Sequence, residues 1–318
     1  ARPLRVPAPC HGRQGSSAGR YPARVPPSPE WRTTLIAHAA LETGLLAAYG
    51  TPSTPAAAAA ATGLDERAAR IVSAALVGSG HLRAAGEALA LTDEGAALVD
   101  PPSPDRDPAG ELHLEARAIR SHLRLAEVLV TGVPADDVSG GDRATRERFM
   151  RAMRAIAGPR ADQSAEAIGP PRGRGRLLDV GGAPGTYARR LARAGWDVTV
   201  LDLPGALEVG APGLAAAGVA AVPGDATAGL PEGPWDAVYL GNVLHLFDPV
   251  TAEAVIARAA GALAPDGLLA VQEVLGDRSP QGPSFGVMML LSTPGGDAHG
   301  GDDYRRWMTA AGCPPERV

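Results

Sequence analysis

The stretch RLLDVGGAPG at 176–185 joins a short apolar run directly to a loop that holds three glycines. An apolar run of this length before glycine is typical of a strand buried on both faces, as in a parallel sheet. Glycines in the loop permit positive φ and let a ligand approach the backbone closely. Since ligands of doubly wound sheets bind outside the carboxyl ends of the strands, this loop is a candidate binding element.

The pattern of the chain after residue 176 predicts the fold around this strand. Short β-branched runs alternate with helical segments rich in Ala, Arg and Leu, and the expected strands are RLLDV, DVTVLD, AAVPGD, WDAVYLG and LLAVQEV. We expect the first crossover helix to begin at about Thr186 and the last helix to cover DDYRRWMTAAGC. The alternation predicts an α/β protein with a Rossmann-like doubly wound sheet.

Four regions are expected along the 318 residues, a length that suggests one large domain or two ordinary ones. Residues 1–29 have no periodicity and are rich in Pro, Gly and Arg, so we expect an irregular arm. Residues 30–105 predict a helical domain and 106–170 a mostly helical linker. Residues 171–318 predict the sheet domain.

The segments within 30–105 have the order of a winged helix-turn-helix. WRTTLIAHAALETGLLAAY, at 31–49, predicts one helix that ends at Gly50. Two helices joined by a glycine turn follow, with Thr54 and Asp65 as their N-caps, and then a short ribbon that ends in ALALT.

A winged helix often binds DNA, but the charges of this chain disfavour a DNA-binding regulator. The second of the two helices carries Arg67 and Arg70 against Asp65 and Glu66, and the net charge of the chain is −5. Phosphate contacts need clustered Lys and Arg. The mostly apolar helix is better suited to packing between subunits, so we expect no nucleic acid partner.

Cysteine content and hydropathy indicate the compartment in which the protein is found. Cys10 and Cys313 are the only cysteines, which excludes a disulfide framework and fits a reducing cytoplasm. No apolar run approaches the roughly 18 residues of a membrane span. The first 30 residues lack the apolar core of a secretory signal. The sequence therefore predicts a cytoplasmic protein without a membrane partner.

An acidic residue after the second strand predicts what the glycine loop binds. Asp202 ends VTVLD, where a carboxylate can accept both ribose hydroxyls of a nucleoside. The dinucleotide pattern G-x-G-x-x-G fails in both frames, because its later glycines fall on Ala183 and Thr186, or on Pro184 and Tyr187. A nicotinamide oxidoreductase is therefore disfavoured. An acid just before the loop, at 179, suits an amino group better than a pyrophosphate.

Four ordered segments extend this pattern: LLDVGGAPGTYARRLA, VTVLDLPGALE, VPGDATAGLPEGPWDAVYLGNVLHLFD and ALAPDGLLAVQEVL. They resemble the successive motifs of class I S-adenosylmethionine-dependent methyltransferases, and more narrowly the small-molecule O-methyltransferases of plant phenolic and bacterial natural-product pathways. The resemblance covers nearly the whole chain after Pro29. It implies S-adenosylmethionine as cofactor, an N-terminal winged-helix domain that forms a homodimer, and a small-molecule acceptor in secondary metabolism such as antibiotic biosynthesis.

The resemblance also implies which residues bind the cofactor. Its methionine and ribose end would be lined by the glycine loop and the acids around it, and the adenine would lie beside a Gly-Asp pair. The residues carried over are Asp179, Gly181, Gly182, Gly185, Asp202, Leu203, Gly224, Asp225, Ala226 and Asn242. A turn role for Asp225 and a capping role for Asn242 remain open alternatives.

The same resemblance places a catalytic base at His245, in NVLHLFD. An imidazole can take the proton of a hydroxyl as methyl transfer proceeds. The family's Asp and Trp after this histidine are Leu246 and Phe247 here, and the acid that orients it falls on Ala298. Asp297 or His299 is expected to substitute, or the histidine is unassisted. C-methylation, N-methylation and a non-methylating cofactor-binding relative remain alternatives to O-methylation.

An apolar acceptor pocket is expected from two segments that face the acceptor in this family. It would be lined by Phe149, Met150, Met153, Phe285, Met288 and Met289, although each also fits an ordinary core stripe. No metal is expected, because the histidines are scattered. The resemblance further implies two strands after the last helix, which are expected to be truncated or absent since the sequence ends at Val318.

Overall fold

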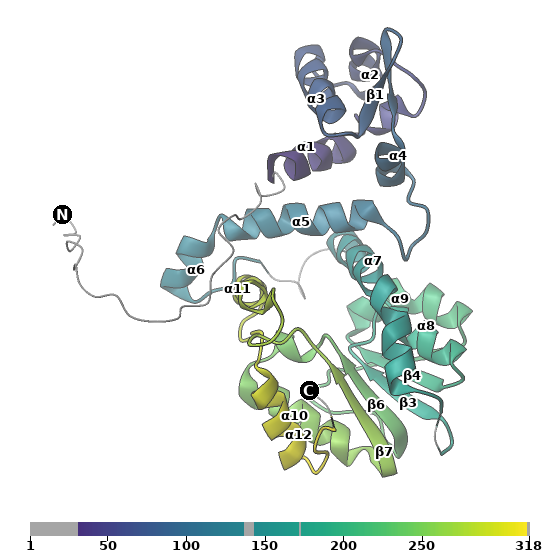
Figure 1. Ribbon diagram of the computed structural model, residues 1–318, viewed down its shortest axis with the longest axis vertical. Coiled ribbons are helices and arrows are strands. Elements are labelled where there is room, and N and C mark those ends of the chain that lie inside the picture. The colour runs from purple at the N-terminus through teal and green to yellow at the C-terminus, as the bar shows by residue number, and fades with distance from the viewer. Residues whose placement is uncertain (1–30, 137–142, 172, 317–318) are drawn as a thin grey trace, which may run out of the picture. The chain divides into compact units, whose positions relative to one another are not determined.

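A five-stranded parallel sheet forms the centre of the computed structural model, which describes residues 31–136, 143–171 and 173–316 (Figure 1). Its order is β5-β4-β3-β6-β7, and every neighbouring pair is parallel. The strands are β3 (Arg176–Val180), β4 (Asp197–Asp202), β5 (Ala220–Pro223), β6 (Trp235–Gly241) and β7 (Leu263–Gln272). The order reverses between β3 and β6, so their carboxyl ends flank the switch point where such sheets bind ligands.

Helices cover both faces of this sheet (Figure 1). Successive residues of a strand face opposite sides, so Leu177 packs among the residues of one core and Leu178 among those of the other. On the Leu177 side lie α8 (Thr186–Arg193), α9 (Pro204–Ala216) and the end of α7 (Arg143–Ile168). On the other side lie α10 (Pro249–Gly261) and α12 (Gly301–Ala310). The predicted Rossmann-like doubly wound sheet is confirmed, and α8 begins at Thr186 as expected.

The N-terminal part of the described chain has its own apolar core, centred on buried side chains such as Leu46, Leu76 and Leu82. Its elements are α1 (Trp31–Glu42), η1 (Ala47–Tyr49), α2 (Pro55–Thr62), α3 (Glu66–Gly78), β1 (Leu82–Ala85), β2 (Ala88–Leu91) and α4 (Asp93–Val99). Thr54 and Asp65 cap α2 and α3, as predicted, by accepting backbone N–H groups three residues on. The antiparallel β1–β2 ribbon completes the expected order of helix, turn, helix and ribbon.

The single helix expected over 31–49 was wrong. Helix α1 ends at Glu42, and Gly44 adopts a φ of 74°, in the left-handed region that glycine tolerates and that a continuing helix excludes. The turn lets Leu45 and Leu46 enter the core before the short η1. Gly50, the expected cap, does cap η1: it has right-handed helical conformation, and its N–H donates to the carbonyl of Ala47 at 3.0 Å.

Three helices connect this part to the sheet: α5 (Pro108–His122), α6 (Leu125–Thr131) and α7. Helix α5 packs on both α1 and α7, so it joins the two parts of the described chain. The segment before α5 adds a polar connection, because the Asp105 carboxylate accepts from Arg154 of α7 and from Arg189 and Arg190 of α8. The described residues belong to one compact unit, 31–318.

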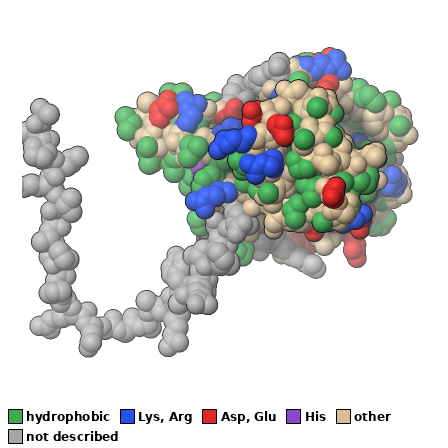
Figure 2. All heavy atoms as spheres, turned by 90° about the horizontal axis from the view of Figure 1, so that it is seen from above, with side chains coloured by type: hydrophobic (Ala, Val, Ile, Leu, Met, Phe, Trp, Pro, Cys, Tyr) green, Lys and Arg blue, Asp and Glu red, His purple; other side chains and the backbone are tan. Residues whose placement is uncertain are grey.

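The surface and the termini complete the description. In the view of Figure 2, Arg side chains are interspersed with Asp, Glu and apolar ones. Among the described residues, no helix is both long and apolar enough to span a bilayer. The expected arm at 1–29, with Cys10, lies outside the described residues.

Candidate active site

The glycine loop after β3 is shaped by close contacts that leave no room for side chains. Gly181 and Gly185 have φ values of 73° and 89°. A Cβ on Gly182 would lie 2.5 Å from the carboxyl carbon of Asp179, and one on Gly185 would lie 2.4 Å from Leu214 Cδ2. The predicted need for glycine at these positions therefore has a steric cause. The lack of side chains lets a ligand at the switch point approach the backbone of the loop.

Asp179, at the end of β3, has an unsatisfied carboxylate. The residue is 2 % exposed, and its Oδ2 has no hydrogen-bond partner among the described residues. Burial, with a smaller contribution from the nearby Asp202 charge, raises the pKa of Asp179 to about 7. A cationic group bound beside this carboxylate would relieve both the missing hydrogen bond and the burial of its charge.

Asp202 ends β4, where the sequence placed it, and holds the loop closed. Its Oδ2 accepts the N–H of Ala183 at 2.9 Å, and its Oδ1 accepts the N–H of Leu203 at 2.7 Å. Burial raises the pKa of Asp202, against these two donors, which lower it. Each carboxylate oxygen has a second lone pair, so the group can still accept hydroxyl hydrogens from a ligand. Leu203 follows as a partly exposed apolar side chain.

The Gly-Asp pair lies beside Asp202 at the same edge of the sheet. The N–H of Gly224 donates to the carbonyl of Asp202 at 2.9 Å, which places Gly224 and Ala226 near the loop end of β4. The exposed Asp225 accepts both the N–H and the hydroxyl of Thr227 at 2.8 Å. These contacts match the turn role that the sequence left open for Asp225. The second carboxylate oxygen of Asp225 is available to a ligand.

A polar network crosses the switch point between β3 and β6. Asn242 has a φ of 56°, and its Nδ2 donates to the hydroxyl of Tyr187 at 3.3 Å. Gln272 Nε2 donates to the same hydroxyl at 3.2 Å, while Tyr239 donates to Gln272 Oε1 at 3.0 Å. The predicted Asn242 is thus at the site. Sequence reasoning missed Tyr187, Tyr239 and Gln272, whose polar groups lie within otherwise apolar or helical segments.

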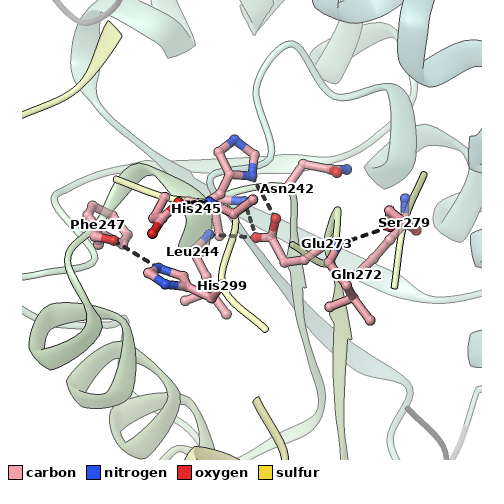
Figure 3. Close-up of polar contacts among 12 residues, drawn as sticks. Asn242, Leu244, His245, Phe247, Gln272, Glu273, Ser279 and His299 are labelled. Carbon is pink, nitrogen blue, oxygen red and sulfur yellow. Dashed lines mark hydrogen bonds and ion pairs between the residues drawn. The ribbon is translucent and has the colours of Figure 1, made fainter. Parts of the chain in front are cut away.

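His245 lies in a short helical turn, η2 (Leu244–Leu246), and its ring is held by a carboxylate (Figure 3). Nδ1 lies 2.6 Å from Oε2 of Glu273, the residue after β7. The other oxygen of Glu273 accepts the N–H groups of Val243 and Leu244 at 2.9 and 2.7 Å. The Glu273 side chain is 1 % exposed. An ionised carboxylate only accepts, so His245 carries its proton on Nδ1 and leaves Nε2 as the acceptor.

Glu273 is the acid that contacts the histidine ring, and sequence reasoning missed it. Asp297, one expected substitute, accepts its own neighbour's N–H through Oδ1 and donates its backbone N–H to the His245 carbonyl. His299, the other, donates from Nε2 to the carbonyl of Phe247 at 3.0 Å (Figure 3). The available signal was Glu273 itself, the one acidic residue of the segment LLAVQEV.

The six residues expected to line an acceptor pocket come from two helices, α7 and α11 (Gly282–Ser292). Phe285 reaches the catalytic candidate, since its ring meets that of His245 edge-on with centroids 4.9 Å apart. Phe149 lies under the guanidinium of Arg117, 5.7 Å from the ring centroid. Met289 is buried, and Met150, Met153 and Met288 are half-buried. Contact of all six with an acceptor stays a prediction.

The residues at the carboxyl edge fit the expected cofactor. A bare glycine backbone, an unpaired buried carboxylate at Asp179 and a ribose-type acceptor at Asp202 match the amino group and nucleoside of S-adenosylmethionine. Asp179 would hold its amino group, and Asp202 its ribose.

Comparison with known proteins identifies methyltransferases as relatives of this chain. A family model described as a methyltransferase domain matches residues 144–315. The chain is 29% identical to the 3-hydroxy-5-methyl-1-naphthoate 3-O-methyltransferase of Streptomyces sahachiroi, over 91% of this chain and 88% of that one. It is 28% identical to the mitomycin biosynthesis 6-O-methyltransferase of Streptomyces lavendulae, over 90% and 87%.

A solved structure shares the fold. Human N-acetylserotonin methyltransferase in complex with SAM superposes with a TM-score of 0.74 at 21% identity, covering 89% of this chain and 88% of that chain. This protein therefore has the same fold as that solved methyltransferase structure. Since the family model matches more than half of the chain, the protein belongs to the methyltransferase-domain family.

Proposed function

We propose that this protein is an S-adenosylmethionine-dependent O-methyltransferase that acts on a hydroxyl of a small, mostly apolar aromatic molecule. The observation that carries the proposal is the His245–Glu273 pair, which lies at the carboxyl edge of the sheet that also holds the glycine loop. The enzyme class and cofactor rest on the methyltransferase family match and on the O-methyltransferases to which the chain is similar.

The donor end is built from backbone and acids. S-adenosylmethionine supplies a sulfonium-bound methyl carbon that is open to in-line attack by a nucleophile. Asp179 binds the cationic amino group and becomes ionised as it does so, while Asp202 binds the ribose and keeps the glycine loop closed. The close packing of Gly182 against Asp179 fixes the carboxylate toward the site.

The acceptor end is built around His245. Its Nε2 accepts the proton of the acceptor hydroxyl, because Glu273 keeps the ring proton on Nδ1 and orients the imidazole. A phenol has a pKa near 10 and a free imidazole near 6.5, so transfer is coupled to methylation rather than complete before it. Phe285 packs edge-on against the ring, and His245 is buried. Positioning of hydroxyl and donor supplies much of the acceleration.

The names of the relatives support the acceptor class. One methylates the 3-hydroxyl of a hydroxynaphthoate, and another is named for mitomycin biosynthesis. Their hydroxyl acceptors and natural-product setting favour O-methylation over methylation at carbon or nitrogen, and place this protein in secondary metabolism. The half-buried Phe and Met side chains of α7 and α11 suit such an irregular apolar molecule.

The proposal extends to the organisation of the whole chain. We propose that 30–105 forms a winged-helix domain used for homodimerisation, that 106–170 contributes to the acceptor pocket, and that 171–318 binds the cofactor. A cytoplasmic setting is proposed from the two cysteines alone.

Transfer of a labelled methyl group tests the proposal. The protein is incubated with methyl-labelled S-adenosylmethionine and a panel of phenols and naphthols, and the products are analysed for an aryl methyl ether. Donor affinity is measured separately by calorimetry. We expect His245→Ala to reduce turnover about 100-fold or more while donor affinity is kept. Saturable donor binding with label on carbon or nitrogen would contradict O-methylation, and absence of donor binding would contradict the whole proposal.

A further inference from the structure

A basic cavity of about 200 Å³ lies between α1, α5 and the first turns of α7. Side chains that line it include His38, His113, Arg117, Arg120, Arg148 and Phe149. Among the described residues around it, Glu42 is the only acid. The cavity therefore combines one aromatic wall with an excess of positive charge.

The arginines of this cavity are poorly neutralised from within the chain. Arg117 donates through Nε to Asp136, but its Nη2 is buried and has no partner among the described residues. No carboxylate of the described residues forms an ion pair with Arg120 or Arg148. A buried donor without an acceptor is costly, so an anionic group that enters the cavity would gain the missing hydrogen bond.

The two histidines make the cavity a poor site for a cation. Arg120 Nη2 donates to Nδ1 of His38 at 3.3 Å, so His38 carries its proton on Nε2 and donates it to Nδ1 of His113 at 2.9 Å. Although Glu42 lies 3.7 Å from His113, both nitrogens of His38 and Nδ1 of His113 are already used. Burial, followed by the field of Arg120, lowers the pKa of His38, as burial and His38 lower that of His113. A metal ion would have to displace these bonds beside three guanidinium groups.

Near Phe149, which lines the cavity, α7 also contacts the helix that follows Asp202. Phe149, which lines the cavity, lies on the same first turns of α7 as Arg146. The Arg146 side chain packs on Gly205, because a Cβ on Gly205 would lie 3.2 Å from its Nε. Gly205 is three residues after Asp202, the expected ribose acceptor. Phe149 and Arg146 are three residues apart on one side of α7, so its first turns contact both the cavity and α9, which begins two residues after Asp202.

Arg117, another residue of the cavity, is connected to the catalytic candidate through Asp136 and α11. Asp136, the partner of Arg117, donates its backbone N–H to the carbonyl of Leu291 at 3.1 Å, at the end of α11. Phe285, which touches the His245 ring, lies six residues earlier on the same helix, or about 9 Å along its axis. Helix α11 therefore connects Phe285, beside His245, with Asp136, the partner of Arg117.

We propose that this cavity binds a carboxylate on the acceptor, so that the substrate class is an aromatic hydroxy acid. This inference rests on the proposed function, because it assumes that the acceptor hydroxyl lies at His245. The guanidinium groups of Arg117, Arg120 and Arg148 present the paired donors that match a carboxylate. Phe149, under Arg117, supports the ring that carries the carboxylate.

Matched pairs of probes test the inference. Hydroxybenzoates and hydroxynaphthoates are compared with their carboxamides, which keep the shape but lose the charge. Affinity is measured by calorimetry with S-adenosylhomocysteine present, and methyl transfer is measured with labelled donor. We expect at least one carboxylate to bind about tenfold or more tightly than its carboxamide. Arg120→Met and Arg148→Met should each reduce that preference severalfold and leave the carboxamide unchanged.

The controls separate this inference from the proposed function. Arg83→Met, on the exposed face of β1, should keep the full preference. Equal affinity for both members of every pair, or binding of neither, overturns the carboxylate site. Binding of inorganic phosphate or acetate without any preference among the acceptors also overturns it, since the anion then comes from elsewhere. Methyl transfer to the carboxamides in these cases would leave the proposed function intact, whereas loss of donor binding would remove both.

Discussion

Glu273 contacts three groups of the turn that carries His245, since one oxygen meets the imidazole Nδ1 and the other meets two backbone N–H groups. We expect Glu273→Gln to reduce kcat about 100-fold, because the amide cannot hold both the ring proton and the two N–H groups. Donor affinity should change less than about threefold, a difference near 0.7 kcal/mol. Steady-state methyl transfer and calorimetry measure the two effects.

A double variant tests whether the two residues act as one unit. His245→Ala combined with Glu273→Gln should be no slower than His245→Ala alone, because Glu273 acts only through the ring. Multiplicative losses in kcat would show instead that Glu273 contributes separately, through the backbone of Val243 and Leu244.

The raised pKa of Asp179 predicts that donor affinity depends on pH. Because burial raises its pKa to about 7, the carboxyl must lose a proton when it binds a cation below that pH. We expect affinity for S-adenosylmethionine to rise up to about tenfold per pH unit between pH 5 and 7 and then to level off. In Asp179→Asn the affinity should be lower and nearly independent of pH over this range. Calorimetry across pH 5–8.5 would reveal a flat wild-type profile if the assignment is wrong.

The same raised pKa affects the stability of the ligand-free protein. Between about pH 4 and 7 the unfolded chain has released this proton and the folded chain has not, so stability falls as pH rises. Above pH 7, we expect Asp179→Asn to unfold with a free energy up to about 4 kcal/mol greater than wild type. The gap should close near pH 4. Denaturant titrations at pH 4.5 and 8 test the sign, and a constant difference would refute it.

Gly182 tests the steric argument for the loop. Gly182→Ala places a Cβ 2.5 Å from the Asp179 carboxyl, and the strain of such overpacking is about 1–3 kcal/mol. We expect donor affinity to fall about ten- to 100-fold. Gly78→Ala, at the end of α3 where the added Cβ has open space, is the matched control and should bind normally. Equal affinities of the two variants would argue against a donor site here.

Exposed apolar side chains on and beside α6 (Leu125–Thr131) are expected to add to the homodimer contact of the N-terminal domain. Leu123, Leu129 and Val130 are 81, 72 and 86 % exposed, an unusual amount of apolar area for three neighbouring positions. We expect the wild type to elute as a dimer in size-exclusion chromatography and Leu129→Asp with Val130→Asp to elute as a monomer. Val250→Asp, at an equally exposed position of α10, should stay dimeric. A monomeric wild type would contradict the homodimer.

The structural features that were predicted well depend on residues close together in the sequence. An apolar run before glycine fixed β3 and the start of α8, because a strand buried on both faces permits little else. Thr54 and Asp65 were found as caps because the groups they accept lie three residues away. The helix over 31–49 failed where local periodicity continued through Gly44, whose turn is set by the packing of Leu45 and Leu46.

The parts that could not be predicted depend on distant residues. Glu273 and His245 are 28 positions apart and meet only because β6 and β7 are neighbours in the sheet. His38 and His113 are 75 positions apart, and no spacing rule brings α1 and α5 together. The sequence resemblance predicted His245 as the base and put its acid on Ala298, whereas the sheet register brings Glu273 to the histidine ring instead.

The carboxylate of Asp105 has a consequence for engineering this enzyme. It joins the segment before α5 to Arg154, Arg189 and Arg190, so three cations of the catalytic half share a counter-ion from the other half. A chimaera that exchanges this segment with that of a relative must carry an acid at this position, or Arg154 and Arg189 lose their counter-ion while Arg190 keeps only Asp162. Recombination boundaries placed after α7 would break the connection, whereas boundaries before residue 100 would preserve it.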